Sequence, residues 1–182
     1  ALIVELDFFG IKGYGEAPAI YYYDVTIDGM IEIIESKRKM IEQFSYSNPD
    51  RYWHYLHHLL PGQPFLICAL DIASWDIYGK MKGKQLHQLW NLDISNNPVT
   101  DFTIGIDSEE KMIAKMKETP WPIYKIKLGT DNDVSLIKAL RKHTDATFRI
   151  DANAAWKAEE ALEKIKAFKD LGVELIEQPL AK

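Results

Sequence analysis

Three side chains suited to proton transfer recur at one position of a repeating strand–helix pattern. Lys127 lies at the end of a predicted strand, Asp151 directly follows the next strand, and Glu177 directly follows the one after it. The separations are 24 and 26 positions, each close to one strand–helix repeat. The carboxyl ends of neighbouring parallel strands meet at one edge of a sheet, which is where sites form in such folds. We therefore expect these three side chains to lie together.

The two carboxylates predict a metal ion bound through oxygen. Neighbouring strands lie about 4.8 Å apart, so Asp151 and Glu177 can reach one cation. No Cys or His accompanies them in the pattern, which favours Mg²⁺ over Zn²⁺. Two carboxylates are few for a metal site, so we expect a third ligand from a strand beyond Lys182.

Lys125 and Lys127 alternate around Ile126, so both lysines point to the same face of the strand. A second ammonium group and a nearby cation each lower a lysine pKa, which suits Lys127 to act as a base. Taken singly, the lysines read as a solvated sheet face, Asp151 as a helix cap and Glu177 as a loop charge. The joint spacing favours a site over these ordinary readings.

The composition sets broad limits. The chain has 182 residues, a formal net charge of −5 and a hydrophobic fraction of 47%. We expect a globular protein with neither a nucleic-acid nor a membrane partner, because the charge is acidic and no apolar run could span a bilayer. Cys68, the single cysteine, is predicted to be a small core residue and fits a reducing, cytoplasmic location. Whether the protein is a homo-oligomer is left open.

The N-terminal part, residues 1–98, predicts an α+β unit. A strand over residues 1–6 and another around Tyr14 are punctuated by glycines at 10, 13 and 15. Three helices follow: one with Asp28 as its N-cap, one between residues 49 and 61, and one over about residues 64–79. The third is apolar nearly all round, so we expect it to be buried on most sides.

After Pro98 the pattern changes to alternating strands and helices. Strands are predicted over residues 100–105, 124–128, 147–150 and 173–176, with helices between them, the first capped by Ser108. The helix over residues 156–171 is expected to turn Ala161, Ile165 and Phe168 inward. Such alternation predicts a parallel sheet. A closed barrel needs about 250 residues, so these residues form either a small open sheet or part of a barrel. The chain stops just after the fourth strand, which favours a truncated barrel.

Three motifs carry a resemblance to a known family. Tyr-Lys-Ile-Lys-Leu-Gly (124–129), Arg-Ile-Asp-Ala-Asn-Ala-Ala-Trp (149–156) and Ile-Glu-Gln-Pro-Leu (176–180) resemble the enolase superfamily, muconate-lactonizing subgroup. The segments 15–17 and 69–80 are similar to that family's N-terminal hairpin and capping-domain helix. The resemblance implies an α/β protein with an α+β capping domain (1–98) followed by the first half of a (β/α)₇β TIM-like barrel (99–182).

The resemblance also implies roles. In this superfamily a Lys or His base works with Mg²⁺ ions. Lys127 would be the acid/base catalyst, and Lys125 would contact the substrate carboxylate. Asp151 and Glu177 would be the first two Mg²⁺ ligands. Thr103, in a segment similar to the first barrel strand of dipeptide epimerases, would contact substrate from the end of its strand. The third carboxylate, the opposing lysine and an Asp-x-Asp motif would lie beyond Lys182.

We therefore expect a Mg²⁺-dependent isomerase that removes a proton α to a carboxylate and epimerises a dipeptide. Other reactions on the same scaffold stay open: o-succinylbenzoate synthesis, cycloisomerisation and acid-sugar dehydration. So does a protein of another class, a non-catalytic binding domain with an open sheet whose lysines and carboxylates are surface charges. His54 and His58, one helical turn apart, are expected to lie on an ordinary helix face.

Overall fold

The structure, a computed structural model, describes residues 1–181, apart from the side chain of Tyr22. The chain divides into two compact units, Ala1–Asn96 and Asn97–Lys182, and each has its own hydrophobic core. Across the described residues, none of the helices has both the length and the apolar character that crossing a membrane requires.

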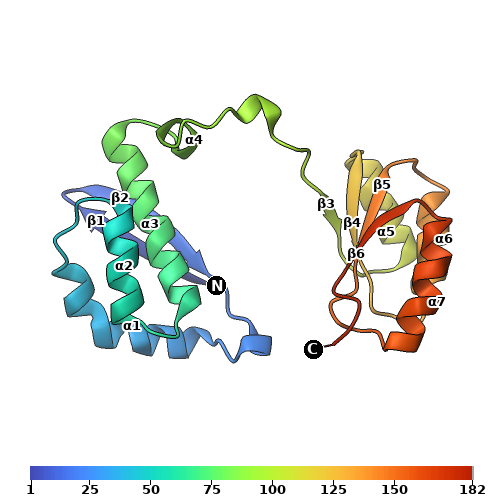
Figure 1. Ribbon diagram of the computed structural model, residues 1–182, viewed down its shortest axis with the longest axis horizontal. Coiled ribbons are helices and arrows are strands. Elements are labelled where there is room, and N and C mark those ends of the chain that lie inside the picture. Colours follow the sequence, from blue (N-terminus) through green and yellow to red (C-terminus); the bar gives the residue numbers. More distant parts are fainter. Residues whose placement is uncertain (182) are drawn as a thin grey trace. The chain divides into compact units, whose positions relative to one another are not determined.

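The first unit is an antiparallel hairpin packed against helices. Strands β1 (Leu2–Phe8) and β2 (Ile11–Ala17) pair from Leu2↔Ala17 to Phe8↔Ile11. The main helices are α1 (Ile27–Glu42), α2 (Pro49–Leu59) and α3 (Pro64–Lys82), and the short elements are η1 (Tyr21–Tyr23), α4 (Leu86–Leu89) and η2 (Ile94–Asn96) (Figure 1). Leu56, Leu66 and Leu70 are fully buried where the helices meet the hairpin.

Two glycines explain how closely α3 approaches the hairpin. We predicted that glycines would mark a turn, and Gly10 does so with φ +82°. Gly13 and Gly15 lie in the second strand predicted around Tyr14, β2, where a Cβ would fall 2.1 Å from the carbonyl oxygen of Ala73 and 1.9 Å from that of Ala69. Only glycine leaves room for the α3 backbone at these two positions.

Two predictions for this unit were wrong. The N-cap of α1 is Thr26, whose hydroxyl accepts a hydrogen bond from the Gly29 amide over 3.2 Å, and Asp28 lies in the first turn. A carboxylate there still favours the helix dipole. Cys68 is exposed rather than in the core. The apolar surface of α3 continues onto the side that the hairpin and α2 leave uncovered, where Ile72 is also exposed.

The second unit is a parallel sheet with helices on one face, as the alternating pattern predicted. The strands follow the order β3 (Phe102–Ile104), β4 (Ile123–Lys127), β5 (Thr147–Asp151) and β6 (Val173–Glu177). The helices α5 (Glu109–Glu118), α6 (Asp133–Arg141) and α7 (Ala158–Lys169) cover the same face (Figure 1). Tyr124, Ile126, Phe148 and Ile150 are buried under them. The alternate side chains therefore lie on the opposite face.

One inward position of α7 was predicted wrongly. Ala161 and Phe168 are buried, but Ile165 is 42% exposed and Lys164 is only 8% exposed. The buried residues of the helix follow the spacing 161, 164 and 168, so the stripe toward the sheet includes a lysine. The buried ammonium group of Lys164 is compensated by a carboxylate, because its Nζ lies 2.8 Å from Asp133 Oδ2.

Candidate active site

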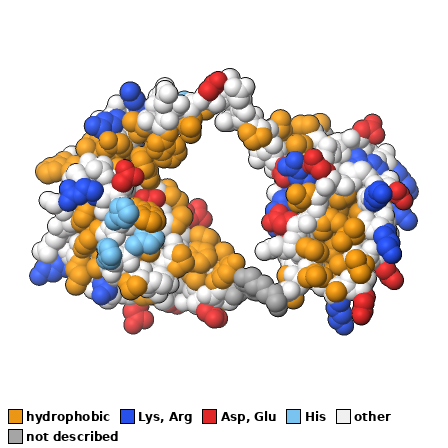
Figure 2. Space-filling view, in the orientation of Figure 1, with side chains coloured by type: hydrophobic (Ala, Val, Ile, Leu, Met, Phe, Trp, Pro, Cys, Tyr) orange, Lys and Arg blue, Asp and Glu red, His pale blue; other side chains and the backbone are white. Residues whose placement is uncertain are grey.

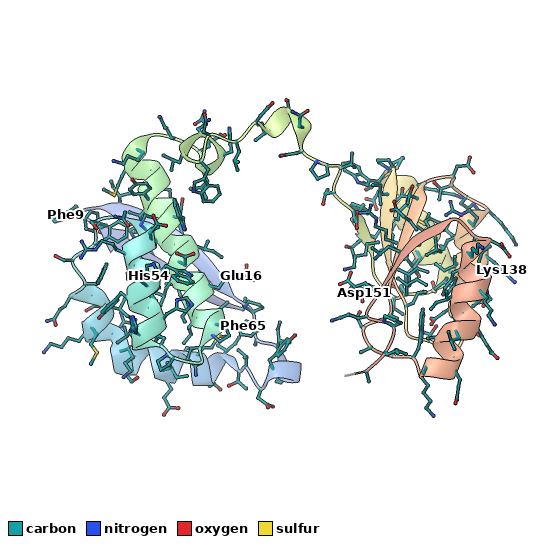
Figure 3. The ribbon with its side chains drawn as sticks, viewed as in Figure 1. Phe9, Glu16, His54, Phe65, Lys138 and Asp151 are labelled. Atoms are coloured by element: carbon teal, nitrogen blue, oxygen red, sulfur yellow. The ribbon has the colours of Figure 1, made fainter. Side chains whose placement is uncertain are left out.

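The face of the second sheet that the helices leave uncovered carries charged side chains at its carboxyl edge. Lys127, Asp151 and Glu177 are register partners, so they form one row across β4, β5 and β6. Figure 3 shows Asp151 on the side of the sheet away from α7, whereas Lys138 lies out on the helical side. The structure thus brings together three of the residues selected from sequence spacing, and Lys125 lies two positions earlier on β4.

Asp151 is the centre of this cluster. Its Oδ2 accepts a hydrogen bond from Lys127 Nζ over 2.6 Å and lies 3.0 Å from Lys125 Nζ. Its Oδ1 accepts the amide of Asn153 over 3.0 Å, and its side chain is only 2% exposed. Lys125 Nζ also donates to Glu177 Oε2 over 2.5 Å. A single positive centre therefore contacts both carboxylates, which shows that their oxygens converge.

The pKa shifts follow from these contacts. Burial by itself raises the pKa of Asp151, but hydrogen bonds from Lys127, the Asn153 amide and Lys125 outweigh it and lower the pKa below its usual range. The pKa of Lys125 is raised, chiefly by its hydrogen bond to Glu177. From the sequence we expected a lowered lysine pKa. For Lys125 the direction is the opposite, because two carboxylates stabilise its ammonium form more than burial opposes it.

Thr103 belongs to the neighbouring row. It pairs in register with Lys125 and is the middle residue of β3 rather than its last. Its side chain is exposed. Thr103 lies two register positions before the row that contains Lys127 and Asp151, so the structure does not place it at the carboxyl end of its strand.

Arg149, which we did not select from the sequence, shares the row of Thr103 and Lys125. Arg149 pairs with Lys125 across the sheet and donates to Asp101 Oδ1 over 2.8 Å and to Glu174 Oε2 over 2.7 Å. It lies two positions before Asp151 on the same strand, so its side chain points to the same face. The period of two within residues 149–151 was the signal that could have found it. The charged face therefore extends over two rows.

The donor set suits a hard cation but is incomplete. Nowhere in residues 1–181 does the structure place three or more His, Cys, Asp or Glu side chains so that they could hold a metal ion. Figure 2 shows histidine side chains gathered over α2, the helix that carries His54 and His58, but within the described residues they form no such group. Asp151 and Glu177 offer converging carboxylate oxygens of the kind that Mg²⁺ prefers. These two carboxylates could therefore occupy two of the ligand positions around such an ion.

The chain resembles curated proteins along almost its whole length. Residues 108–182 match the family model described as "Enolase C-terminal domain-like". The L-Ala-D/L-amino acid epimerase of Flavobacterium johnsoniae is 49% identical over 180 residues, which cover 99% of this chain and 54% of that protein. The protein of the same name from a Maribacter species is 51% identical over 98% of this chain and 53% of its own length. The chain thus spans about half the length of these relatives.

Solved structures support the same relationship. The dipeptide epimerase from Enterococcus faecalis V583 superposes with a TM-score of 0.80 at 33% sequence identity, covering 98% of this chain and 54% of that one. The likeness includes both units, and it agrees with the capping-domain and partial-barrel architecture that the sequence motifs implied. Over residues 108–182 the chain is thus similar to the enolase C-terminal domain-like family, and over almost its whole length it is similar to proteins named epimerases.

Proposed function

We propose that the full protein is a Mg²⁺-dependent epimerase that removes and returns the proton α to the carboxylate of a dipeptide. The observation that carries the proposal is the row formed by Lys127, Asp151 and Glu177 across three parallel strands, with Lys125 beside it. A proton α to a carboxylate is barely acidic, so its removal needs positive charge close to the carboxylate oxygens. This row combines an amine, a second ammonium group and two hard oxygen ligands in one place.

Asp151 and Glu177 would hold the Mg²⁺ ion. Lys125 Nζ contacts both carboxylates, at 3.0 Å and 2.5 Å, and so marks a position where positive charge is stabilised by the two together. When bound, the ion supplies charge that stabilises the substrate carboxylate as the α-carbon loses its proton. A third ligand would come from a part of the protein outside this chain.

The two lysines take different parts. Lys125 would bind the substrate carboxylate, because an ammonium group forms charge-assisted hydrogen bonds with a carboxylate. Lys127 moves the α-proton on one face of the substrate, and Asp151 fixes the direction of its amine through the 2.6 Å contact. A second base, outside this chain, would act on the opposite face.

The substrate class follows from the relatives. The two proteins that are 49% and 51% identical are both named L-Ala-D/L-amino acid epimerase. We infer a dipeptide with L-Ala first and a second residue that varies. Lactonisation, acid-sugar dehydration and o-succinylbenzoate synthesis, which the same scaffold supports, are disfavoured by the names of these relatives. A binding domain with surface charges is disfavoured, because the central carboxylate, Asp151, is buried among cations.

The test is isotope exchange. The full protein with Mg²⁺ is incubated in D₂O with a set of L-Ala-L-X dipeptides, and mass spectrometry follows incorporation of one deuterium while chiral chromatography follows epimerisation. We expect both with at least one dipeptide, and we expect chelation of the metal to abolish them. Absence of exchange with every dipeptide, together with turnover of a muconate or an acid sugar, would overturn the proposal.

A further inference from the structure

A fully buried carboxylate lies close to the candidate active site without belonging to it. Asp133 is the first residue of α6 and is 0% exposed. Its Oδ1 accepts hydrogen bonds from the amides of Gly129 (3.1 Å) and Thr130 (2.8 Å), and from the Thr130 hydroxyl. Its Oδ2 accepts from Trp156 Nε1 (2.7 Å) and Lys164 Nζ (2.8 Å). An Asp at a helix start ordinarily caps its own helix, but these bonds join three other segments.

Lys164 completes the network from α7. Its ammonium group donates to Asp133, to Glu160 Oε1 (2.6 Å) and to the carbonyl oxygen of Thr130 (3.3 Å), and it lies 4.8 Å from the Trp156 ring. Burial by itself raises the pKa of Asp133, but Lys164 and the loop amides outweigh it and hold the pKa below its usual range. A buried ion pair is rarely more stabilising than apolar side chains of the same size. Stability alone therefore does not account for a lysine at this buried position.

The loop that Asp133 holds follows the strand of Lys127. The Leu128 amide donates to the carbonyl oxygen of Asp151 over 2.9 Å, which extends the pairing of β4 and β5 by one residue. Gly129 then passes directly over the loop after β5. A Cβ at this position, where φ is +127°, would lie 3.0 Å from Ala155 Cβ. The loop after Lys127 and the loop after Asp151 are therefore in direct contact.

Trp156 connects the same carboxylate to the third strand end. Its indole donates to Asp133, while its backbone amide donates to the carbonyl oxygen of Pro179 over 3.0 Å. Two further backbone bonds join these loops, from Ala152 to Glu177 (3.1 Å) and from Ala154 to Gln178 (2.7 Å). Ala154 and Gln178 both have positive φ, at 62° and 43°. Residues other than glycine rarely adopt a positive φ unless the surrounding structure holds their backbone there.

We propose that Asp133, Lys164 and Trp156 are positioning residues, whose buried network sets the relative placement of the strand ends that carry Lys127, Asp151 and Glu177. Within the described part of the chain, none of the side-chain hydrogen bonds of this network involves Lys127, Asp151 or Glu177. The network acts through the three loops that leave the sheet at those residues. The inference deepens the proposed function and rests on it only for the kinetic readout.

The test compares Trp156→Phe and Asp133→Asn with a matched control, Tyr124→Phe, all in the full protein. Tyr124 is buried near the opposite end of β4, where its hydroxyl accepts the Trp121 amide (2.9 Å) and lies 3.1 Å from the carbonyl oxygen of Met116. Each variant removes buried hydrogen bonds from the same unit. Hydrogen exchange, read by mass spectrometry of peptides over residues 125–131, 152–158 and 176–181, measures loop opening without requiring any activity.

We expect protection in those three peptides to fall by about 10- to 100-fold in Trp156→Phe, as for loss of a hydrogen bond to a charged group. We expect kcat for epimerisation to fall by about 10- to 100-fold, as when support for a metal site is lost, with a much smaller change in KM. Tyr124→Phe should leave both unchanged. If the loops and kcat respond no more in Trp156→Phe than in Tyr124→Phe, the inference is wrong, even if Asp133→Asn fails to fold. If the full wild-type protein has no epimerase activity, but loop protection still falls in Trp156→Phe and not in Tyr124→Phe, the proposed function is contradicted and the positioning network is supported.

Discussion

Asp151 Oδ2 accepts a hydrogen bond from Lys127 Nζ over 2.6 Å, between two residues that are register partners on neighbouring parallel strands. The proposed metal ligand therefore also orients the proposed base. Lys125 Nζ lies 3.0 Å from the same oxygen, so one carboxylate serves both lysines. Because the three groups share partners, the effects of substituting them should not be additive.

Removal of the Lys127 amine should stop proton exchange for one substrate enantiomer. In Lys127→Ala we expect exchange at that α-carbon to fall by about 10²–10⁴-fold, which is the usual contribution of a positioned acid–base group. Lys127→Arg should not restore it, because a guanidinium group does not lose its proton at working pH. Proton NMR of each enantiomer in D₂O measures the rates separately. Unchanged exchange at both enantiomers would remove Lys127 from the mechanism.

Loss of either proposed metal ligand should weaken Mg²⁺ binding. For Asp151→Asn and Glu177→Gln we expect the dissociation constant, measured by isothermal titration calorimetry, to rise by more than the roughly 10- to 100-fold that supporting residues of a metal site contribute. Glu174→Gln is the matched control, because Glu174 lies on the same strand and pairs with Arg149 instead. Equal Mg²⁺ affinity in all three variants would refute the ligand assignment.

Sequence spacing predicted the row at the carboxyl edge because one strand–helix repeat returns the chain to the same edge of a parallel sheet. Lys127, Asp151 and Glu177 therefore meet even though each is ambiguous alone. Spacing could not predict that Lys164 is buried. That outcome depends on Asp133, 31 positions away, and on an ion pair that no helical period encodes.

Local signals failed where neighbouring groups decide the outcome. Asp28 and Thr26 are both plausible caps, and only the backbone geometry selects Thr26. The pKa of Lys125 depends on the balance between burial and its two carboxylate partners, and the carboxylates dominate. The pattern around Tyr14 predicted a strand, but it could not show that Gly13 and Gly15 in that strand admit the backbone of α3.

Acid should remove the contribution of Asp133 to stability. Its pKa in the folded protein is below the ordinary value of 3.8, so this contribution is fully present above that value and is lost as the pH falls through the lower, folded-state value. Above about pH 5 we expect Asp133→Asn to be less stable than the wild type by up to about 3–5 kcal/mol, because Lys164 loses its buried partner. Below pH 3.8 the difference should shrink. Melting temperatures between about pH 3 and pH 7 measure it, and parallel curves over that range would contradict the prediction.

A methyl group at Gly129 should separate the loops that follow Lys127 and Asp151. In Gly129→Ala the new Cβ would lie 3.0 Å from Ala155 Cβ and 3.4 Å from the carbonyl oxygen of Ala152, at φ +127°. We expect a loss of about 1–3 kcal/mol from the strained backbone.

The control for this prediction is Gly105→Ala, which alters the loop after β3. A Cβ there has nothing within 4 Å, and Gly105 does not have a positive φ. Its stability should stay within about 0.5 kcal/mol of the wild type. Because Gly129 lies two residues after the proposed base, Gly129→Ala should also lower kcat, whereas Gly105→Ala should not. Thermal unfolding and steady-state kinetics of both variants provide the comparison. Equal stability and equal kcat in the two variants would show that close contact between the loops is not what places Lys127 beside Asp151.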